Sequence, residues 1–105
     1  MEHSRMQQIR SMLEKEPMDD FLNYALALEY EKDGQLLLAQ STIEALLSRN
    51  ENYQGAYYKL GALYEKTGEQ DKAILVYRKG MALSKASNNR RAYAELQEAL
   101  QNLEV

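Results

Sequence analysis

The side chains that most often carry catalysis are few in this chain and do not form a recognisable set. Its one histidine is His3, and there is no cysteine among the 105 residues. Nucleophilic catalysis by serine needs a histidine that the fold can bring to it, and phosphate binding needs a glycine-rich loop. The sequence offers neither pattern, so His3 is interpreted as incidental. We predict that the protein is not an enzyme and has no cofactor and no metal site.

Neighbouring carboxylates have a simpler interpretation than acid–base catalysis. Asp19 and Asp20 directly precede a run of apolar residues at helical spacing. An aspartate at this place accepts a backbone hydrogen bond and interacts favourably with the helix dipole. Glu95 and Glu98 fall on the polar side of another expected helix. These acids are therefore predicted to start helices or to face solvent.

The charge balance argues against nucleic acid as a partner. The chain has 13 Lys and Arg against 16 Asp and Glu, a net charge of −3, whereas binding to phosphate backbones requires a basic surface. No apolar run approaches the length that crosses a bilayer, and the first ten residues lack the apolar core of a secretion signal. The absence of cysteine suits a reducing compartment. We expect a cytoplasmic protein without nucleic-acid or membrane partners.

The elements that position any binding residues are set by an internal repeat. A shift of 34 residues superposes two segments without a gap, and the matched pairs are Tyr24/Tyr58, Leu26/Leu60, Tyr30/Tyr64, Gly34/Gly68 and Ala39/Ala73. A period of this length is typical of stacked helical repeats. Each copy buries its apolar face only against its neighbours. Function is therefore expected on surfaces and not in a catalytic pocket.

Apolar residues at spacings of three and four predict six helices and no strand. Gly34 and Gly68 mark turns, and Pro17 ends the first helix. The last helix is expected to be amphipathic, with an apolar stripe opposite a Glu- and Gln-rich face. The predicted helices cover residues 4–15, 19–33, 36–48, 53–66, 70–85 and, after capping residues 87–89, the end of the chain.

These residues resemble the tetratricopeptide repeat family, whose 34-residue unit is a helix–turn–helix with fixed large and small positions. The matching residues are Leu26, Ala27, Tyr30, Gly34, Ala39 and Ile43 in the first copy, and Leu60, Gly61, Tyr64, Gly68, Ala73 and Tyr77 in the second. The resemblance implies an all-α, right-handed helix-turn-helix solenoid of two hairpins with an extra helix at each end.

We predict one domain over residues 1–105. Its parts are an N-terminal half-repeat helix (1–17), repeat one (19–50), repeat two (53–86) and a C-terminal capping helix (88–105). A shift of 34 sets Ile9 on Ile43, so the first helix resembles the second half of a repeat. A shift of 36 sets Leu60 on Leu96, so the last helix resembles a first half. Because two repeats fall short of the usual minimum of about three, both flanking helices are expected to be needed for stability.

Small residues facing large ones are predicted to set the packing between repeats. Ala27 and Gly61 would let paired helices approach closely, with Gly80 as a further close-approach site. Tyr30 and Tyr64 would fill the gap toward the next helix. The complete set of predicted packing residues is Leu26, Ala27, Tyr30, Ala39, Leu60, Gly61, Tyr64 and Ala73.

The resemblance also implies a concave groove, which in this family commonly receives an extended peptide or a partner helix. The predicted groove residues are Phe21, Tyr24, Leu28, Glu31, Tyr58, Ala62, Glu65 and Tyr93. Tyr24 and Tyr58 recur on the face away from the packing residues, and such stiff amphipathic rings suit partner recognition. The same two rings could instead pack across neighbouring helices, and the sequence leaves both interpretations open.

Basic residues give weaker indications. Lys32 and Lys66 suit an acidic partner, but a lysine in the last turn also satisfies the helix dipole. Arg90 and Arg91 start the last helix, where the dipole disfavours them, and are interpreted as a solvated pair or as held for a ligand or an adjacent carboxylate. Family members that bind acidic chaperone tails use a clamp of lysine, asparagine and arginine. The corresponding residues here, Tyr24, Leu28, Lys59, Asn89 and Tyr93, do not form it.

The leading functional hypothesis is a protein–protein interaction module, an adaptor or scaffold that binds a peptide segment or helix in its groove. Since the acidic-tail clamp is absent, an apolar or mixed segment is the expected ligand. The alternative is a self-associating structural protein, a homodimer through its terminal helices or the rim of its groove. The expected state is a monomer or a weak homodimer.

Overall fold

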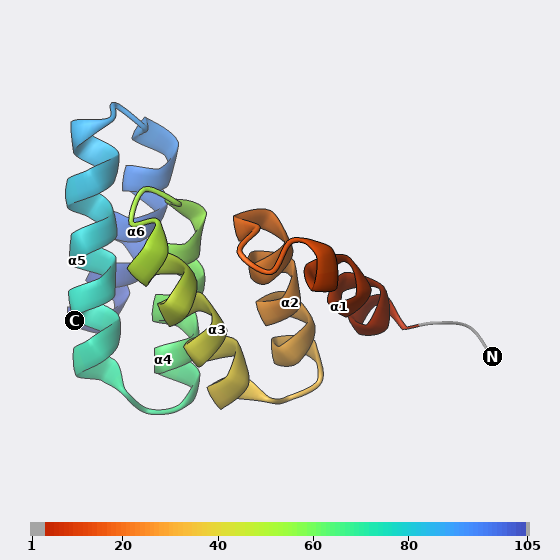
Figure 1. Ribbon diagram of the computed structural model, residues 1–105. Coiled ribbons are helices and arrows are strands. Elements are labelled where there is room, and N and C mark those ends of the chain that lie inside the picture. The colour runs from red at the N-terminus through yellow and green to blue at the C-terminus, as the bar shows by residue number, and fades with distance from the viewer. Residues whose placement is uncertain (1–3, 105) are drawn as a thin grey trace. The chain divides into compact units, whose positions relative to one another are not determined.

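The computed structural model describes residues 4–104, and every regular element in that range is a helix (Figure 1). The helices are α1 (Arg5–Lys15), α2 (Asp20–Lys32), α3 (Leu36–Arg49), α4 (Gly55–Lys66), α5 (Gln70–Ala86) and α6 (Arg90–Glu104). The all-α repeat fold predicted from the sequence is thus confirmed. The chain divides into two compact units, Met1–Asn50 and Glu51–Val105. The prediction of one domain over the whole chain stays a prediction.

Local side-chain contacts fix where the helices of the first unit begin. The Ser4 hydroxyl accepts a hydrogen bond from the backbone N–H of Gln7, and the Gln7 side chain accepts one from the backbone N–H of Ser4. This reciprocal pair is a capping box. Asp19 starts α2 by accepting from the backbone N–H of Leu22. The predicted role of Asp19 as a helix start is confirmed, and it explains the short break after Pro17.

The core of the first unit lies mainly between α2 and α3, and α1 packs on α2. Its buried apolar residues are Ile9, Ala25, Ala27, Ala39, Ile43 and Leu46. Only Ile9 comes from α1. Two polar contacts add to that helix: the guanidinium of Arg5 pairs with Glu29, and that of Arg10 donates to the Tyr30 hydroxyl and lies over its ring. Helix α1 is therefore held in place more by polar contacts at its surface than by buried apolar side chains.

Three of the turns between helices have the same left-handed backbone conformation at one residue. Gly34 and Gly68 both have φ +78°, and Asn88, between α5 and α6, has φ +60°. In each turn the residue after the left-handed one donates its N–H to the carbonyl five residues earlier, as Asn89 does to Ser84. This is the Schellman arrangement, which satisfies carbonyls at a helix end and favours glycine or asparagine. The predicted turn positions and the short link into α6 follow from it.

The second unit consists of α4, α5 and α6, and α5 and α6 run side by side (Figure 1). The fourth helix was expected from Tyr53, but α4 begins at Gly55 because residues 51–54 form a turn in which the Tyr53 carbonyl accepts from the N–H of Ala56. The buried apolar residues of the second unit are Ala56, Tyr57, Leu60, Leu63, Tyr64, Ala73, Tyr77, Leu96 and Leu100. All three helices of this unit contribute buried side chains.

Two glycines of the second unit stand where backbone and side chain meet closely. A Cβ at Gly80 of α5 would lie 2.7 Å from Cβ of Tyr57 and 2.9 Å from Cδ1 of Leu96. A Cβ at Gly61 of α4 would overlap the ring of Tyr77. Distances this short lie inside van der Waals contact. Glycine at both positions is what lets α5 approach its two neighbours.

The last helix covers α5 with one face and presents the other to solvent. Leu96 and Leu100 are buried, whereas Glu95, Gln97, Glu98 and Gln101 are exposed. Asn89 caps the helix, since its Oδ1 accepts from the N–H of Ala92, and its amide donates to the side chain of Gln54. Gln54 in turn donates to the Ser87 hydroxyl. These bonds fasten the turn between α5 and α6 to the residues just before α4.

Candidate functional site

The first unit presents the predicted α2 face, which comprises Phe21, Tyr24, Leu28 and Glu31. Their spacing of three and four residues places them along one side of the helix. Phe21 is 67% exposed, and the other three are half-buried. Lys32 follows in the last turn of the helix and is exposed. The α2 face is therefore an apolar strip on which the Phe21 ring is the most exposed side chain, with the charged residues Glu31 and Lys32 at its C-terminal end.

The second unit presents the predicted α4 face, which comprises Tyr58, Ala62 and Glu65. Tyr58 is 45% exposed, Ala62 is half-buried and Glu65 is exposed. The predicted groove residue of α6, Tyr93, is half-buried in the same unit. Each unit thus carries one exposed aromatic ring on the first helix of a repeat hairpin. We call these helices, α2 and α4, first-type helices, and the second helices of the hairpins, α3 and α5, second-type helices.

Tyr77 of α5 links two residues of the α4 face. Its ring centroid lies 6.3 Å from that of Tyr58, with the ring planes tilted by 40°. Its hydroxyl donates a 2.5 Å hydrogen bond to Oε2 of Glu65. Tyr58 therefore packs across the neighbouring helix with one side of its ring, as the second interpretation of the sequence proposed, and exposes the rest. Glu65 is held in place by a buried residue while remaining exposed.

Burial raises the pKa of the Tyr77 hydroxyl far above 10, and the hydrogen bond to Glu65 and the charge of that carboxylate raise it further. Burial, with a smaller contribution from Glu51, also raises the pKa of Tyr57, whose hydroxyl donates to the Glu51 carbonyl. In both cases the charged phenolate is disfavoured. Tyr77 is thus a fixed hydrogen-bond donor and not a proton carrier at neutral pH.

This pKa shift predicts a pH dependence of stability. Above about pH 10 an unfolded tyrosine loses its proton while folded Tyr77 keeps it, so the stability that is present below pH 10 is lost as pH rises. For one such group the free energy of unfolding falls by up to about 1.4 kcal/mol per pH unit. Urea unfolding between about pH 9 and 11 measures this slope. In Tyr77→Phe this slope is expected to be smaller by the contribution of one bound proton. An unchanged slope would contradict a raised pKa of Tyr77 in the folded protein.

The predicted packing residues vary in burial. Ala27, Ala39, Leu60, Gly61, Tyr64 and Ala73 are buried, whereas Leu26 and Tyr30 are half-buried. Tyr30 contacts Arg10 of the preceding helix α1. The ring of Tyr64 lies under the ammonium group of Lys72, 5.7 Å from its centroid. Both tyrosines thus use their ring faces for a cation on an adjacent helix, a detail that helical spacing does not reveal.

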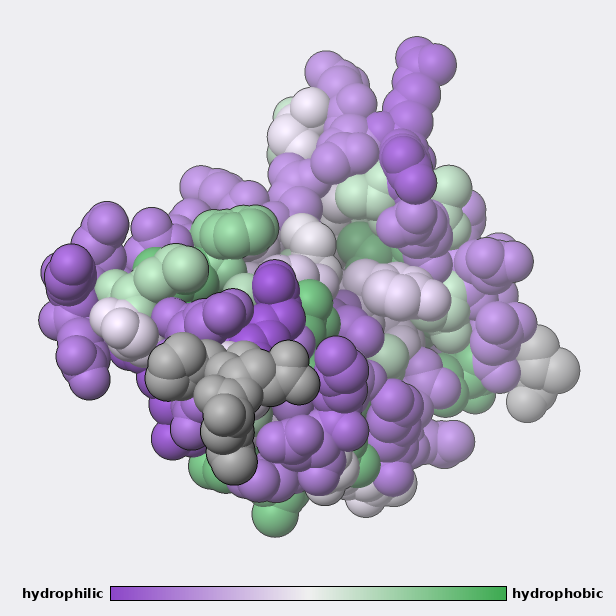
Figure 2. Space-filling view, turned by 90° about the vertical axis from the view of Figure 1, so that its right-hand side faces the viewer, coloured by the Kyte–Doolittle hydropathy of each residue, from purple (hydrophilic) through white to green (hydrophobic). Residues whose placement is uncertain are grey.

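Apolar side chains also reach the surface away from the predicted faces. Figure 2 shows apolar side chains between hydrophilic ones on one side of the molecule. The large exposed apolar residues are Met12, Met18, Phe21, Leu37, Leu38, Tyr58 and Leu75. Only Phe21 and Tyr58 of these belong to the α2 and α4 faces. The other exposed leucines lie on second-type helices and offer matched controls for binding experiments.

Some sequence-based predictions fall outside these faces. His3 lies outside the described residues. Arg91 pairs with Glu95 at 3.5 Å, so an adjacent carboxylate holds it. Among residues 4–104 there is no group of three or more side chains that could hold a metal ion. None of the helices in that range has the length and apolar character that spanning a membrane requires.

These features define a class: an all-α protein built from helix hairpins, with aromatic residues on its first-type helices. A tetratricopeptide repeat domain protein from Salinibacter ruber, solved as a crystal, is 35% identical over 82% of this chain and 96% of that chain, with a TM-score of 0.77. A solution structure of such a protein from the same organism is also 35% identical, covers 84% and 89%, and has a TM-score of 0.80. The chain belongs to the tetratricopeptide repeat family.

A more distant structure shares the fold. A protein from Bordetella parapertussis is 21% identical over 98% of this chain and 90% of that chain, with a TM-score of 0.86. No family model matches the chain, and neither does any curated protein. Structures of this family are typically non-catalytic interaction modules, so in general terms the chain is a protein–protein interaction module with other proteins as partners.

Proposed function

We propose that the protein binds an apolar or mixed segment of another protein through its α2 and α4 faces, with a contribution from Tyr93 of α6, which belongs to the same unit as the α4 face. The observation that carries this proposal is the exposure of Phe21 and Tyr58, 67% and 45%, on the first-type helices of the two units. Large rings exposed next to half-buried aliphatic residues are typical of interaction sites. A single groove lined by both faces stays a prediction from the family resemblance.

The composition of the faces favours a segment that is not strongly charged. The α2 face combines one exposed ring with half-buried Tyr24 and Leu28, and its only acid is Glu31. The α4 face has Glu65, which the Tyr77 hydroxyl already binds. Rigid rings that become fully covered contribute most to such contacts because they lose little conformational freedom. We therefore assign affinity to the rings and orientation to the carboxylates.

A quantitative pull-down from lysate of the native organism tests the proposal. Proteins retained by the wild type are expected to be lost, by about tenfold or more in affinity, with Tyr24→Ala/Tyr58→Ala and with Phe21→Ala. Phe21 is the cleanest of the three because its side chain is mostly exposed. Circular dichroism establishes that each variant is folded.

The matched control is Leu37→Ala/Leu75→Ala, which removes two leucines of 70% and 67% exposure from α3 and α5. This variant is expected to retain the same proteins as the wild type. Loss of binding in the control alone would place the interaction on second-type helices and would overturn the proposal. Light scattering across a range of concentrations separates a foreign partner from self-association.

A further inference from the structure

The turn between α5 and α6 in the second unit surrounds a pocket of about 280 Å³. Its lining residues are Ser84, Lys85, Asn88, Asn89, Arg90 and Tyr93. Only Tyr93 belongs to the residues assigned to binding above. We propose that this pocket binds a carboxylate group of a partner segment, with an apolar side chain of that segment against the ring of Tyr93. The inference rests on the proposed function only in taking a protein segment as the ligand.

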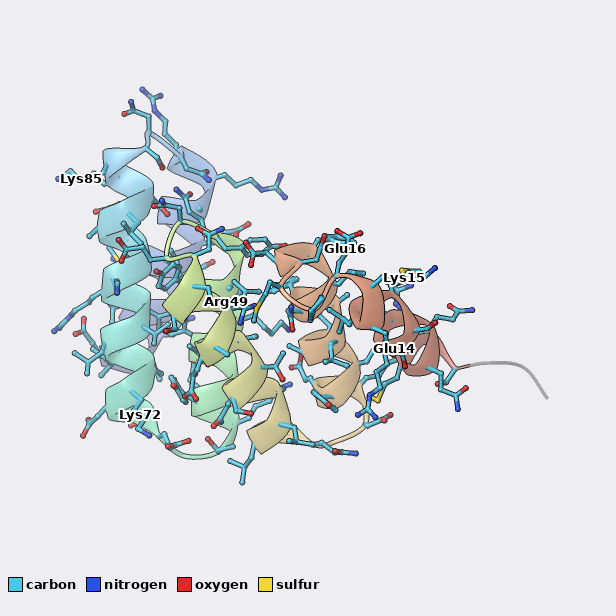
Figure 3. The ribbon with its side chains drawn as sticks, viewed as in Figure 1. Glu14, Lys15, Glu16, Arg49, Lys72 and Lys85 are labelled. Atoms are coloured by element: carbon cyan, nitrogen blue, oxygen red, sulfur yellow. The ribbon has the colours of Figure 1, made fainter. Side chains whose placement is uncertain are left out.

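The two cations of the pocket differ from the other cations of these helices. On α5 and α6, four basic side chains have carboxylate partners: Lys72 with Glu69, Arg78 with Glu104, Lys79 with Glu51 and Arg91 with Glu95. Lys85 and Arg90 have no such partner among residues 4–104, and both line the pocket, which has no acidic residue in its wall. Figure 3 shows Lys85 in the last turn of α5. The pocket therefore has uncompensated positive charge.

The backbone around the pocket favours an anion for a separate reason. Arg90 is the first residue of α6, where N–H groups lack partners within the helix and the dipole attracts negative charge. Asn89 satisfies only the N–H of Ala92. Free carbonyls at the C-terminal end of α5 would repel an anion. Those of Ser84 and Lys85 already accept hydrogen bonds from the backbone N–H groups of Asn89 and Asn88, which reduces this repulsion. An anion would also offset the unfavourable position of Arg90 in the first turn.

Ser84 supplies an independent indication of a ligand. It is fully buried in the wall of the pocket, and its hydroxyl has no hydrogen-bond partner within residues 4–104. Buried hydroxyl groups are nearly always satisfied, by protein, water or ligand. The hydroxyl is closed off from solvent in this structure, so a carboxylate oxygen can accept its hydrogen bond only after the pocket wall opens around Ser84. The small volume suits one side chain or a chain end, since pockets for whole small molecules start at about 300 Å³.

The carboxylate could come from a glutamate side chain or from a chain terminus, and three peptide probes distinguish the sources. The probes are acetyl-Ala-Leu-Glu-amide, acetyl-Ala-Leu-Gln with a free C-terminus, and neutral acetyl-Ala-Leu-Gln-amide. Each is titrated into the ¹⁵N-labelled full chain while amide shifts are followed by NMR. At least one charged probe is expected to shift the amides of Arg90, Arg91 and Tyr93 saturably, and the neutral probe is expected to leave them unchanged.

Variants test which residues hold the probe. Lys85→Gln/Arg90→Gln is expected to weaken binding about tenfold or more, as for lost hydrogen bonds to charged groups, and Ser84→Ala less. Lys15→Gln/Lys79→Gln makes the same change in net charge at exposed positions outside the pocket and is expected to bind like the wild type. No saturable shift with either charged probe, equal shifts with the neutral one, or equal weakening in the control overturns the proposal.

The two proposals fail in different ways. If Tyr24→Ala/Tyr58→Ala loses its partners while no probe reaches the pocket, the carboxylate site is wrong and the exposed faces stand. If the charged probes bind as expected while that variant keeps every partner, the pocket stands and the exposed faces are wrong. The NMR titration needs no knowledge of the natural partner, so its outcome does not depend on the pull-down.

Discussion

Ending the chain after Asn88, and so removing α6, is expected to lower the free energy of unfolding of the second unit by about 5 kcal/mol. The helix contributes the buried side chains of Leu96 and Leu100, and each buried leucine contributes about 1.5–3 kcal/mol. Its removal also exposes the close contact of Leu96 with Gly80. A loss of this size equals the whole stability of a marginal domain. Circular dichroism during urea unfolding is expected to show the second unit largely unfolded.

The matched truncation removes α1 by starting the chain at Glu16. Because α1 contributes only Ile9 as a buried residue, with a partly exposed ion pair from Arg5 to Glu29 and a contact from Arg10 to Tyr30, the expected loss is about 2 kcal/mol. Both truncations are thus predicted to destabilise, as expected for a short array, but unequally. No loss on removing α6 would mean that its buried leucines do not support the second unit, and equal losses would mean that α1 contributes more than its one buried residue.

Helix ends were predictable from the sequence because the groups that fix them are close in the chain. Asp19 caps α2 through a residue three positions away, and Gly34 and Gly68 take the left-handed backbone that their turns require. The 34-residue period identified the hairpins because the same packing positions recur in both copies of the repeat. The start of α4 was the exception: nothing near Tyr53 indicated that a turn would continue to Gln54.

The pocket and the Tyr77 contacts could not be predicted from one helix at a time. The hydrogen bond from Tyr77 to Glu65 joins α5 to α4, and a helical wheel places residues only within their own helix. Lys85 and Arg90 line one pocket because the turn at Asn88 reverses the chain between them. In the sequence Arg90 stood beside Arg91 as a basic pair. The structure separates the two, since Arg91 binds Glu95 and Arg90 lines the pocket.

One such contact could have been found from the repeat itself. The first copy has Ala27 and Ile43 where the second has Gly61 and Tyr77, each pair related by the shift of 34 residues. All four residues are buried. The smaller residue on α4 thus accompanies the larger one on α5, as a conserved total volume in a packed interior requires. This compensation indicates that Gly61 is glycine because Tyr77 is tyrosine.

Replacing Gly61 with alanine is therefore expected to lower the free energy of unfolding by about 3 kcal/mol. The new Cβ would overlap the Tyr77 ring, with Cζ at 2.5 Å and Cδ1 at 2.6 Å. Tyr77 is 1% exposed and bound through its hydroxyl to Glu65, so the ring has little room to move. Overpacking of this kind commonly destabilises by about 1–3 kcal/mol. Urea unfolding followed by circular dichroism measures the loss.

The control is Gly55→Ala, where a Cβ meets nothing within 4 Å and alanine is expected to be neutral or slightly stabilising. The decisive variant is Gly61→Ala/Tyr77→Ile, which recreates the Ala27 and Ile43 pair of the first copy. Tyr77→Ile alone leaves a gap and removes the bond to Glu65, so it is expected to be destabilising. If the volumes compensate, adding Gly61→Ala to that background costs little, and the two changes are non-additive by about 2 kcal/mol. Additive losses would show that Gly61 serves the backbone of α4 and not the ring of Tyr77.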